Sequence, residues 1–207
     1  MKETLKKLKK DVKSFQHLVE TQKKEISRLS SLVDYDFLTG LYNRQGFVRE
    51  AEKFFDELRG EMNKKERRKI AFTFKNFSVI FADLDNLKVI NDKYGHKAGD
   101  RALKAAARIF KNSIRHFDII GRWGGDEFVV GLIGVSEKEA LKVTQKMKKN
   151  LKLTKVNGFG LSASFGIITA INKRRENILN LYELIERADM AMYEAKKNKG
   201  KGLIIVH

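Results

Sequence analysis

The first 33 residues carry a regular seven-residue pattern of hydrophobic positions. The first heptad position holds Leu5, Val12, Val19, Ile26 and Val33, and the second holds Leu8, Phe15, Gln22 and Leu29. Mostly β-branched residues at the first position, with Leu frequent at the second, favour a parallel two-stranded coiled coil whose register the polar Gln22 would help to fix. The alternative is an amphipathic helix packed on its own domain. Such a helix drifts toward a 3.6-residue period, so the sustained 3.5-residue period favours the coiled coil.

From residue 34 onward, stretches of helical periodicity alternate with short apolar runs. The helical patterns predict helices over residues 45–68, 98–114, 137–150 and 178–198. The apolar runs predict strands over residues 77–82, 161–170 and 203–206, and a hairpin from residues 119–120 and 128–133. This order, βαββαβ with a late extra strand, predicts an α+β fold of ferredoxin-like plan, with a mixed sheet and helices packed on one face. We divide the chain into a dimerising helix, residues 1–33, and one folded domain, residues 34–207.

The composition fits a globular protein with a substantial core. Of 207 residues, 42% are hydrophobic and 33% are charged, which argues against a disordered or membrane-embedded chain. No stretch approaches the length of a transmembrane helix, and the charged N-terminus has no signal-peptide core, so we expect no direct membrane insertion and a cytoplasmic location. The absence of cysteine excludes disulfides and thiolate metal sites and leaves oxygen-ligated hard cations open.

The formal net charge of +17 would attract nucleic acid, an anionic surface or a polyphosphate substrate. A nucleic-acid-binding module is therefore an alternative class of function. Such a module needs a concentrated basic face with stacking aromatic side chains. The lysines of this chain are dispersed over the predicted helices, and Trp123 is the single tryptophan. We therefore expect no nucleic-acid partner.

The predicted hairpin carries candidate chemistry at its turn, in the run Gly121–Phe128. Two β-like runs joined through Gly-Gly indicate a turn with positive φ, which would lift Asp126 and Glu127 to the rim of the sheet. Gly-Gly-Asp is also common turn chemistry, so an ordinary surface hairpin is the alternative.

Asp83 follows the predicted strand 77–82, so its carboxylate should emerge at the end of that strand. If the strand neighbours the hairpin, Asp83 approaches Asp126 and Glu127. Clustered carboxylates repel unless cations lie among them, and Mg²⁺ is typically held by one or two carboxylates together with phosphate oxygens. Taken alone, Asp83 would be read as a strand-end cap.

The run Gly124–Phe128 is similar to the signature of the GGDEF domain, the catalytic domain of bacterial diguanylate cyclases. Other motifs match that family in order and spacing: Asp36–Arg44, Asp83-Leu84-Asp85, Lys88, Asn91-Asp92, Gly95-His96 and Gly99-Asp100. The resemblance extends over roughly residues 34–206. It implies a fold related to the palm of nucleotidyl cyclases and polymerases. It also implies a homodimer that condenses two GTP into cyclic di-GMP and two pyrophosphates.

The resemblance implies two Mg²⁺ or Mn²⁺ ions per active site, bound by Asp83, the Leu84 carbonyl, Asp126 and Glu127. Glu127 either binds metal or helps to remove the proton from the ribose 3′-hydroxyl; the sequence leaves both roles open for the pair Asp126 and Glu127.

Substrate contacts are implied for a further group: Asn86, Leu87, Lys88, Asn91, His96, Asp100, Lys196 and Lys201. Asn91 and Asp100 would read guanine, because a carboxylate accepts hydrogen bonds from N1–H and the 2-amino group that adenine does not present; a buried Asp100 would therefore reject ATP. The backbone around Asn86 and Leu87 would hold the phosphates. The C-terminal run is one residue longer than in the family and has Lys in place of Arg, so Lys196 or Lys197 is the candidate phosphate lysine.

Arg115 and Asp118 resemble the family's inhibitory product site, just upstream of Arg122, and imply feedback inhibition by cyclic di-GMP. A local salt bridge between the two residues is the alternative. Asp36 and Arg44 resemble a structural pair that couples the incoming helix to the domain. The rival functional interpretation is a catalytically silent member that binds GTP or cyclic di-GMP as a receptor; the intact acidic residues argue against it.

Overall fold

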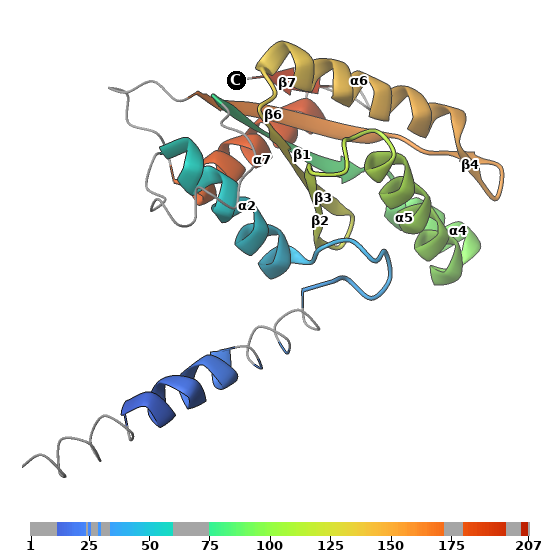
Figure 1. Ribbon diagram of the computed structural model, residues 1–207. Coiled ribbons are helices and arrows are strands. Elements are labelled where there is room, and N and C mark those ends of the chain that lie inside the picture. Colours follow the sequence, from blue (N-terminus) through green and yellow to red (C-terminus); the bar gives the residue numbers. More distant parts are fainter. Residues whose placement is uncertain are drawn as a thin grey trace, which may run out of the picture.

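A five-stranded mixed sheet is the centre of the fold (Figure 1). The structure is a computed structural model that describes residues 12–23, 25, 29, 34–59, 75–171, 180–197 and 204–206. The sheet has the order β2-β3-β1-β6-β7, and its pairings are antiparallel except that of β6 with β7. Its strands are β1 Asn76–Leu84, β2 Ile119–Gly124, β3 Glu127–Ile133, β6 Ala163–Ile171 and β7 Ile204–Val206. A separate small ribbon is formed by β4 Lys155–Val156 and β5 Phe159–Gly160.

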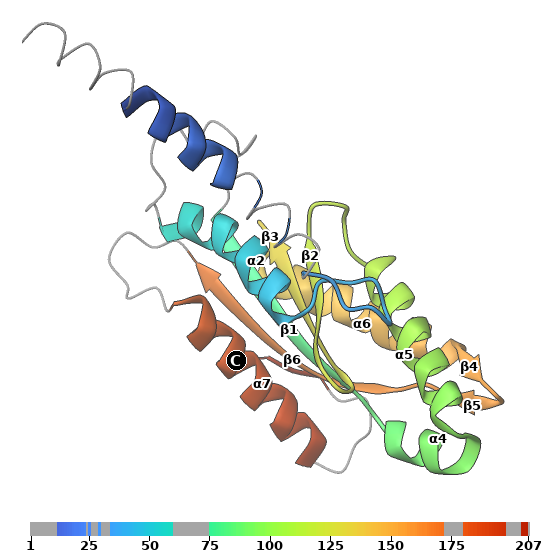
Figure 2. The ribbon, with the colours of Figure 1, turned by 90° about the horizontal axis from the view of Figure 1, so that it is seen from below.

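Helices cover both faces of this sheet (Figure 2). The helices in question are α2 Arg44–Arg59, α4 Leu87–Tyr94, α5 His96–Lys111, α6 Glu137–Leu153 and α7 Leu181–Lys197. On one face, α5 and α6 pack against Ile80 and Ala82 of β1; on the other, α2 and α7 pack against Val79 and Phe81. The expectation of helices on one face was therefore wrong. Every residue of β1 after Asn76 is buried, rather than every second one, and such a strand needs cover on both sides.

The predicted elements occur in the predicted order, with shifts at their ends, whereas helix α4 and the β4–β5 ribbon were not predicted. The helix expected over 45–68 is observed as α2 to Arg59, and residues 60–74 lie outside the described part. Helix α5 starts at His96 and ends three residues before Ile114. Helix α6 begins after Ser136, whose backbone N–H and hydroxyl both donate to the Glu139 carboxylate, at 2.9 and 2.6 Å. These two hydrogen bonds tie the residue before the helix to its first turn and fix where α6 begins.

Residues 34–43, here called the amino-terminal turn, attach to the edge strand β2. The Arg122 N–H donates to the Tyr42 carbonyl at 2.7 Å, and the Tyr42 N–H donates to the Ile120 carbonyl at 3.3 Å. The rings of Tyr35 and Tyr42 stack with centroids 4.9 Å apart, and Asp34 forms an ion pair with Arg49 of α2. The turn is thus held by both the sheet and a helix.

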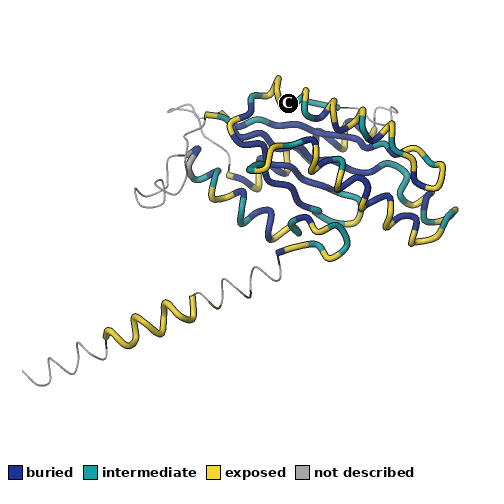
Figure 3. Tube along the Cα trace, turned by 45° about the vertical axis from the view of Figure 1, so that its right-hand side comes forward, coloured by how far each residue is buried: buried dark blue, intermediate teal, exposed yellow. Residues whose placement is uncertain are grey.

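Residues 12–23 are helical and lie apart from the sheet (Figures 1 and 3). Their heptad side chains are open to solvent: Val12 is 50% exposed, Phe15 66% and Val19 47%. Exposed side chains at these positions are those that a coiled coil would bury against a second helix. The other predicted heptad residues except Gln22 and Leu29 fall outside the described residues. None of the described helices is both long enough and apolar enough to cross a membrane.

Candidate active site

Three acidic residues meet at one end of the central strands. Strands β1 and β3 are antiparallel, with Asp83 directly opposite Glu127, so their side chains share one face of the sheet. The Leu84 N–H donates to the Asp126 carbonyl at 3.0 Å, which ties the strand end to the turn of the hairpin. The structure thus brings Asp83 to the hairpin carboxylates, as the strand-end argument predicted.

Asp83 is buried, with 7% of its side chain exposed. Burial raises the pKa of Asp83 to about 6, the nearby charges of Asp126 and Glu127 add to the rise, and Lys196 opposes it. The Lys196 ammonium lies 2.5 Å from Oδ2 of Asp83. Oδ1 of Asp83 is buried and has no hydrogen-bond partner among the described residues. The Asp83 carboxylate therefore has one cationic neighbour, at Oδ2, and one oxygen, Oδ1, that accepts no hydrogen bond from the described residues.

Glu127 and Asp189 extend this acidic cluster. Burial raises the pKa of Glu127, and repulsion from Asp189 and Asp126 raises it further. The pKa of Asp189 is also raised by burial, while Lys196 lowers it. Sequence reasoning missed Asp189, although a signal existed: it lies seven residues before Lys196, two helical turns away on the same face of α7.

The acidic cluster fits a hard cation whose shell is completed by a ligand. Within the described residues, no group of three or more His, Asp or Glu side chains is arranged to hold a metal ion by itself. Mg²⁺ usually takes only one or two carboxylates and fills its octahedron with phosphate oxygens and water. The unpartnered Oδ1 of Asp83, and the ammonium that contacts its Oδ2, indicate that the site favours positive charge.

The predicted nucleotide-recognition residues lie on α4 and α5. Asn86 adopts a left-handed conformation, φ 61°, at the start of α4. As in any α-helix, the first N–H groups of α4 have no intrahelical acceptor. Asn91 is half-buried, and its Oδ1 has no hydrogen-bond partner among the described residues. Gly99 of α5 lies against this oxygen so closely that a Cβ there would collide with it.

Lys88, His96 and Asp100 are exposed. Asp100 lies near the start of α5 on its outer side, away from the apolar face that packs on the sheet, so the burial that rejection of ATP would require is absent from the free protein.

The two C-terminal lysine candidates have different neighbours. Lys196 faces Asp83, whereas Lys197 lies over the ring of Tyr193, 4.5 Å from its centroid. Of the two, Lys196 is the one at the acidic cluster. Lys201 lies outside the described residues.

The predicted product-site residues lie in the loop between α5 and β2. The Asp118 carboxylate accepts hydrogen bonds from the backbone N–H of Arg115, at 2.9 Å, and of Ile133, at 3.1 Å. Burial raises the pKa of Asp118. Arg115 is exposed, and its guanidinium lies over Phe117, 5.8 Å from the ring centroid. The Asp118 carboxylate thus binds backbone N–H groups. This arrangement differs from the alternative, a salt bridge between the side chains of Arg115 and Asp118.

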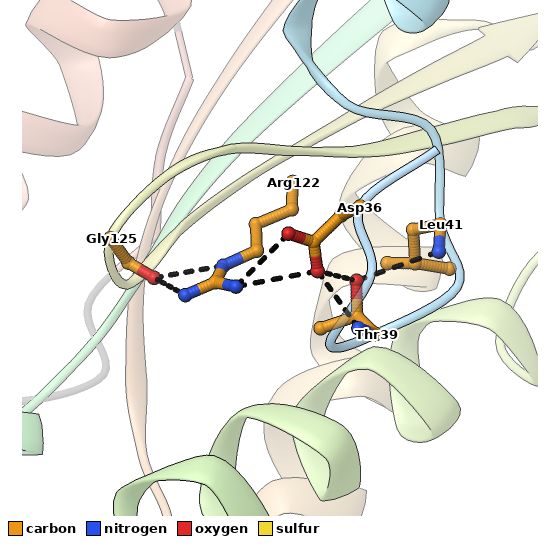
Figure 4. A network of polar contacts seen from close by, with 5 residues as sticks. All are labelled: Asp36, Thr39, Leu41, Arg122 and Gly125. Atoms are coloured by element: carbon orange, nitrogen blue, oxygen red, sulfur yellow. Dashed lines mark hydrogen bonds and ion pairs between the residues drawn. The ribbon is translucent and has the colours of Figure 1, made fainter. Parts of the chain in front are cut away.

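Asp36 pairs with Arg122 rather than with Arg44 (Figure 4). The Arg122 guanidinium lies 3.1 Å from Oδ2 of Asp36, while Arg44 lies over the Trp123 ring, 4.5 Å from its centroid. The predicted Asp36–Arg44 pair was wrong, because Arg44 opens α2 at the surface and packs on the indole ring. These groups line a cavity of about 370 Å³, together with further residues: Asn43, Gln45, Gly124 and Gly125.

A further buried contact supports the end of β1. Ser164 of β6 donates to Oδ1 of Asp85 at 3.0 Å, and the Asp85 N–H donates to the Ser162 carbonyl at 2.9 Å. These bonds fix the turn that follows Asp83. Spacing along the sequence gives no signal for them, because the two segments are about 80 residues apart.

The family model described as "Diguanylate cyclase, GGDEF domain" matches residues 33–202 of the chain. Diguanylate cyclase DgcM of Escherichia coli is 30% identical over 190 residues, which cover 91% of this chain and 42% of that protein. Diguanylate cyclase A of Treponema denticola is 33% identical over 124 residues, which cover 60% of this chain and 33% of that protein. The chain thus spans less than half the length of these curated relatives.

Solved structures show the same fold. A microbial GGDEF domain described in an interaction with cyclic di-GMP is 29% identical, with a TM-score of 0.66, over 86% of this chain and 99% of that one. The coiled coil and GGDEF domain of DgcB from Caulobacter crescentus, in complex with cyclic di-GMP, has a TM-score of 0.72 over 97% of this chain and 99% of that one. At 18% identity, the second likeness concerns the fold alone.

Proposed function

The chain belongs to the family of GGDEF-domain diguanylate cyclases, and from this premise we propose that it condenses two GTP into cyclic di-GMP and two pyrophosphates. The observation that carries the proposal is the cluster of Asp83, Asp126 and Glu127, with its unpartnered carboxylate oxygen and its contact to Lys196. Such a gathering of carboxylates, of which Asp83 is buried, suits a substrate that arrives with divalent cations.

In the proposed reaction, the ribose 3′-oxygen of one GTP attacks the α-phosphorus of the other. The bond from that phosphorus to the bridging oxygen of the β-phosphate breaks, and pyrophosphate leaves. Glu127, at the rim of the sheet, accepts the proton of the 3′-hydroxyl. Asp83, the Leu84 carbonyl and Asp126, with Glu127 as a further ligand, would hold two Mg²⁺ or Mn²⁺ ions, which offset the charge of the phosphates.

The proposed substrate contacts divide between base and phosphates. Asn91 and Asp100 read the guanine edge, and His96 supports that pocket; the unpartnered Oδ1 of Asn91 supports this assignment. Phosphate contacts are proposed for the remaining group: the backbone N–H groups of Asn86 and Leu87, and the side chains of Lys88, Lys196 and Lys201. The free N–H groups at the start of α4 suit an anion.

Two domains must face each other, because each holds one nucleotide and one set of acidic residues. We assign residues 1–33 to a parallel coiled coil that brings two copies of the domain 34–207 together; the exposed Val12, Phe15 and Val19 support this. Cyclic di-GMP would inhibit by binding at Arg115 and Asp118, with Arg122 as a third candidate. Because GTP is an intracellular nucleotide, the domain would act in the cytoplasm.

The proposal is tested by incubating nucleotide-stripped protein with GTP and Mg²⁺ and separating the products by chromatography. Wild-type protein and the control Glu52→Gln, which alters an exposed residue of α2, should form cyclic di-GMP. Asp83→Ala and Glu127→Gln should form none. A stripped, dimeric wild type without product would contradict the proposal and favour a nucleotide receptor.

A further inference from the structure

Helices α5 and α6, which cover the same face of the sheet, carry basic side chains on their outer surfaces (Figures 1 and 2). On α5, exposed basic residues recur every three or four positions: Lys97, Arg101, Lys104, Arg108 and Lys111. Side chains at this spacing lie on one side of a helix. Because the opposite side of α5 packs on the sheet, the basic side faces solvent.

Helix α6 adds a second set of exposed cations: Lys138, Lys142, Lys146, Lys148, Lys149 and Lys152. The two sets adjoin. The Lys146 ammonium donates to the Asn112 carbonyl, at the end of α5, at 3.4 Å. At the other end of α5, Arg101 donates to the Asn157 side chain, in the ribbon that follows α6, at 3.2 Å. These eleven Lys and Arg residues of α5 and α6 are here called the basic layer.

The charge of the helices is distributed unevenly over the two faces of the sheet. Helices α5 and α6 hold only three acidic residues, Asp100, Glu137 and Glu139, each within the first five residues of its helix. On the other face, α2 holds four basic and four acidic residues, and α7 holds three basic and four acidic ones. Of these four helices, only α5 and α6 therefore carry an excess of cations.

The side chains of the basic layer favour an anionic lipid surface over nucleic acid. Nine of the eleven cations are Lys, which contacts phosphates as a point charge, whereas base edges are read best by the planar guanidinium of Arg. Within α5 and α6, all of whose residues the structure describes, Phe110 is the only Phe, Tyr or Trp, and it is buried, so it does not stack on a base.

An apolar side chain lies among the cations at the end of α6. Leu153 is 73% exposed, and its neighbours in the chain, Lys152 and Lys155, are exposed as well. Lysines beside an exposed leucine are typical of helices that bind at a lipid interface, where the apolar side chain enters the boundary between headgroups and acyl chains. This position gives the basic layer a second contact with lipid, besides charge.

The basic layer and the acidic cluster lie on opposite faces of the sheet. Val79 and Phe81 of β1 pack on the face that α2 and α7 cover, and Asp83 continues this alternation. The contact of Asp83 with Lys196 of α7 agrees with that direction. A lipid surface against α5 and α6 would therefore not cover the acidic cluster.

We propose that the basic layer docks on a surface of anionic lipid headgroups, with Leu153 inserted among them. The attachment is peripheral and electrostatic: each Lys or Arg near an anionic membrane adds attraction, and that attraction fades within a Debye length. The inference does not depend on the proposed reaction, because it concerns the face of the sheet away from the acidic cluster.

Sedimentation of the full chain with lipid vesicles, in the absence of nucleotide, tests the proposal. Vesicles of phosphatidylcholine and phosphatidylglycerol should bind the wild type, vesicles of phosphatidylcholine alone should not, and added salt should release the protein. The triple variant Lys104→Glu, Lys142→Glu, Lys149→Glu should bind at least about tenfold more weakly. Leu153→Gln, which leaves the charge unchanged, should weaken binding about threefold.

A second triple variant is the matched control. Lys13→Glu, Lys75→Glu, Arg187→Glu alters the net charge by the same amount at exposed positions outside the basic layer, and it should bind vesicles as the wild type does. Both triple variants should melt within a few degrees of the wild type, because all six positions are exposed. If the first variant fails to fold, the same three lysines are replaced with Gln, and the tenfold expectation becomes about fivefold.

Several outcomes would overturn the proposal. A wild type that does not bind the anionic vesicles would do so, as would equal binding by the two triple variants, which would mean that net charge alone attracts the protein. A wild type that shifts duplex DNA in a gel but does not bind vesicles would assign the basic layer to nucleic acid. An inactive wild type that binds anionic vesicles as expected would refute the proposed function and leave the docking surface intact.

Discussion

At the scale of single residues, the ionised carboxylate of Asp83 opposes folding. Its pKa is about 6 in the fold, against the usual 3.8, because burial and its acidic neighbours disfavour the charge. Between these two values the folded protein still holds a proton that the unfolded chain has released. The free energy of unfolding therefore falls as the pH rises through this window.

Replacing Asp83 with asparagine should remove this fall. In metal-free protein at about pH 7.5, Asp83→Asn should be more stable than the wild type by about 1–3 kcal/mol, and at about pH 4 the two should be nearly equal. Urea unfolding at both pH values measures the difference, and the variant should lack turnover. A variant that is less stable at the higher pH would mean that the ion pair with Lys196 outweighs the burial of the charge.

The neighbouring lysines allow a matched comparison. Lys196→Met should raise the KM for GTP about tenfold, because Lys196 is the lysine that lies at the acidic cluster. Lys197→Met should change the KM by less than about twofold, because Lys197 lies over Tyr193 instead. Initial-rate kinetics measure the KM for GTP of both variants. Equal effects from the two variants would mean that neither lysine has a distinct role at the site.

Contacts between residues could be predicted where the position of each residue in a strand or turn determined which side chains meet. Asp83 at a strand end and Glu127 at a hairpin turn come together because antiparallel pairing places them opposite each other. The contact of Asp36 with Arg122 could not be predicted, because 86 residues separate them and nothing local marks either as the partner. The choice between Lys196 and Lys197 also depended on the direction of each side chain.

At the scale of elements, β6 and α7 approach each other at Gly166. A Cβ at this position would overlap the Ala188 carbonyl oxygen and the Met192 nitrogen, both backbone atoms of α7. Gly166→Ala should therefore push α7, with Lys196 and Asp189, away from the sheet and lower the stability by at least about 2 kcal/mol.

Gly160→Ala is the matched control for this substitution, because nothing lies within 4 Å of the added carbon there. It should change the stability by less than about 0.5 kcal/mol. Thermal unfolding compares the two variants, and the activity of Gly166→Ala should fall as well. Similar melting temperatures for the two variants would show that α7 can move away from position 166 at little cost in stability.

The order of the predicted elements follows from periodicity, whereas helix α4 and the β4–β5 ribbon were not predicted. The layers could have been predicted too, because the near-continuous apolar run Phe77–Ala82 of β1 is typical of a strand buried on both sides. Helix ends shifted where caps and turns decide the boundary: α6 begins after Ser136 because Glu139 bonds back to it.

At the scale of the whole molecule, the heptad side chains of the N-terminal helix predict how activity depends on concentration. Val19→Glu places a charge in the seam and should weaken dimerisation at least tenfold, by a rough estimate, so that specific activity rises with protein concentration. His17→Glu, on the outer side of the heptad pattern, should leave the dimer intact. Analytical ultracentrifugation and activity over a dilution series measure both. A monomeric wild type with full activity would contradict the proposed assembly.

The attachment of the amino-terminal turn to β2 also affects aggregation. An exposed edge strand offers unpaired N–H and C=O groups to any neighbouring sheet, and two domains tethered side by side meet at high local concentration. Here Tyr42 occupies the backbone groups of Ile120 and Arg122 along the edge strand β2, and β7 at the other edge has only three residues. In the proposed dimer, two copies would therefore face each other with little tendency to pair through the edges of their sheets.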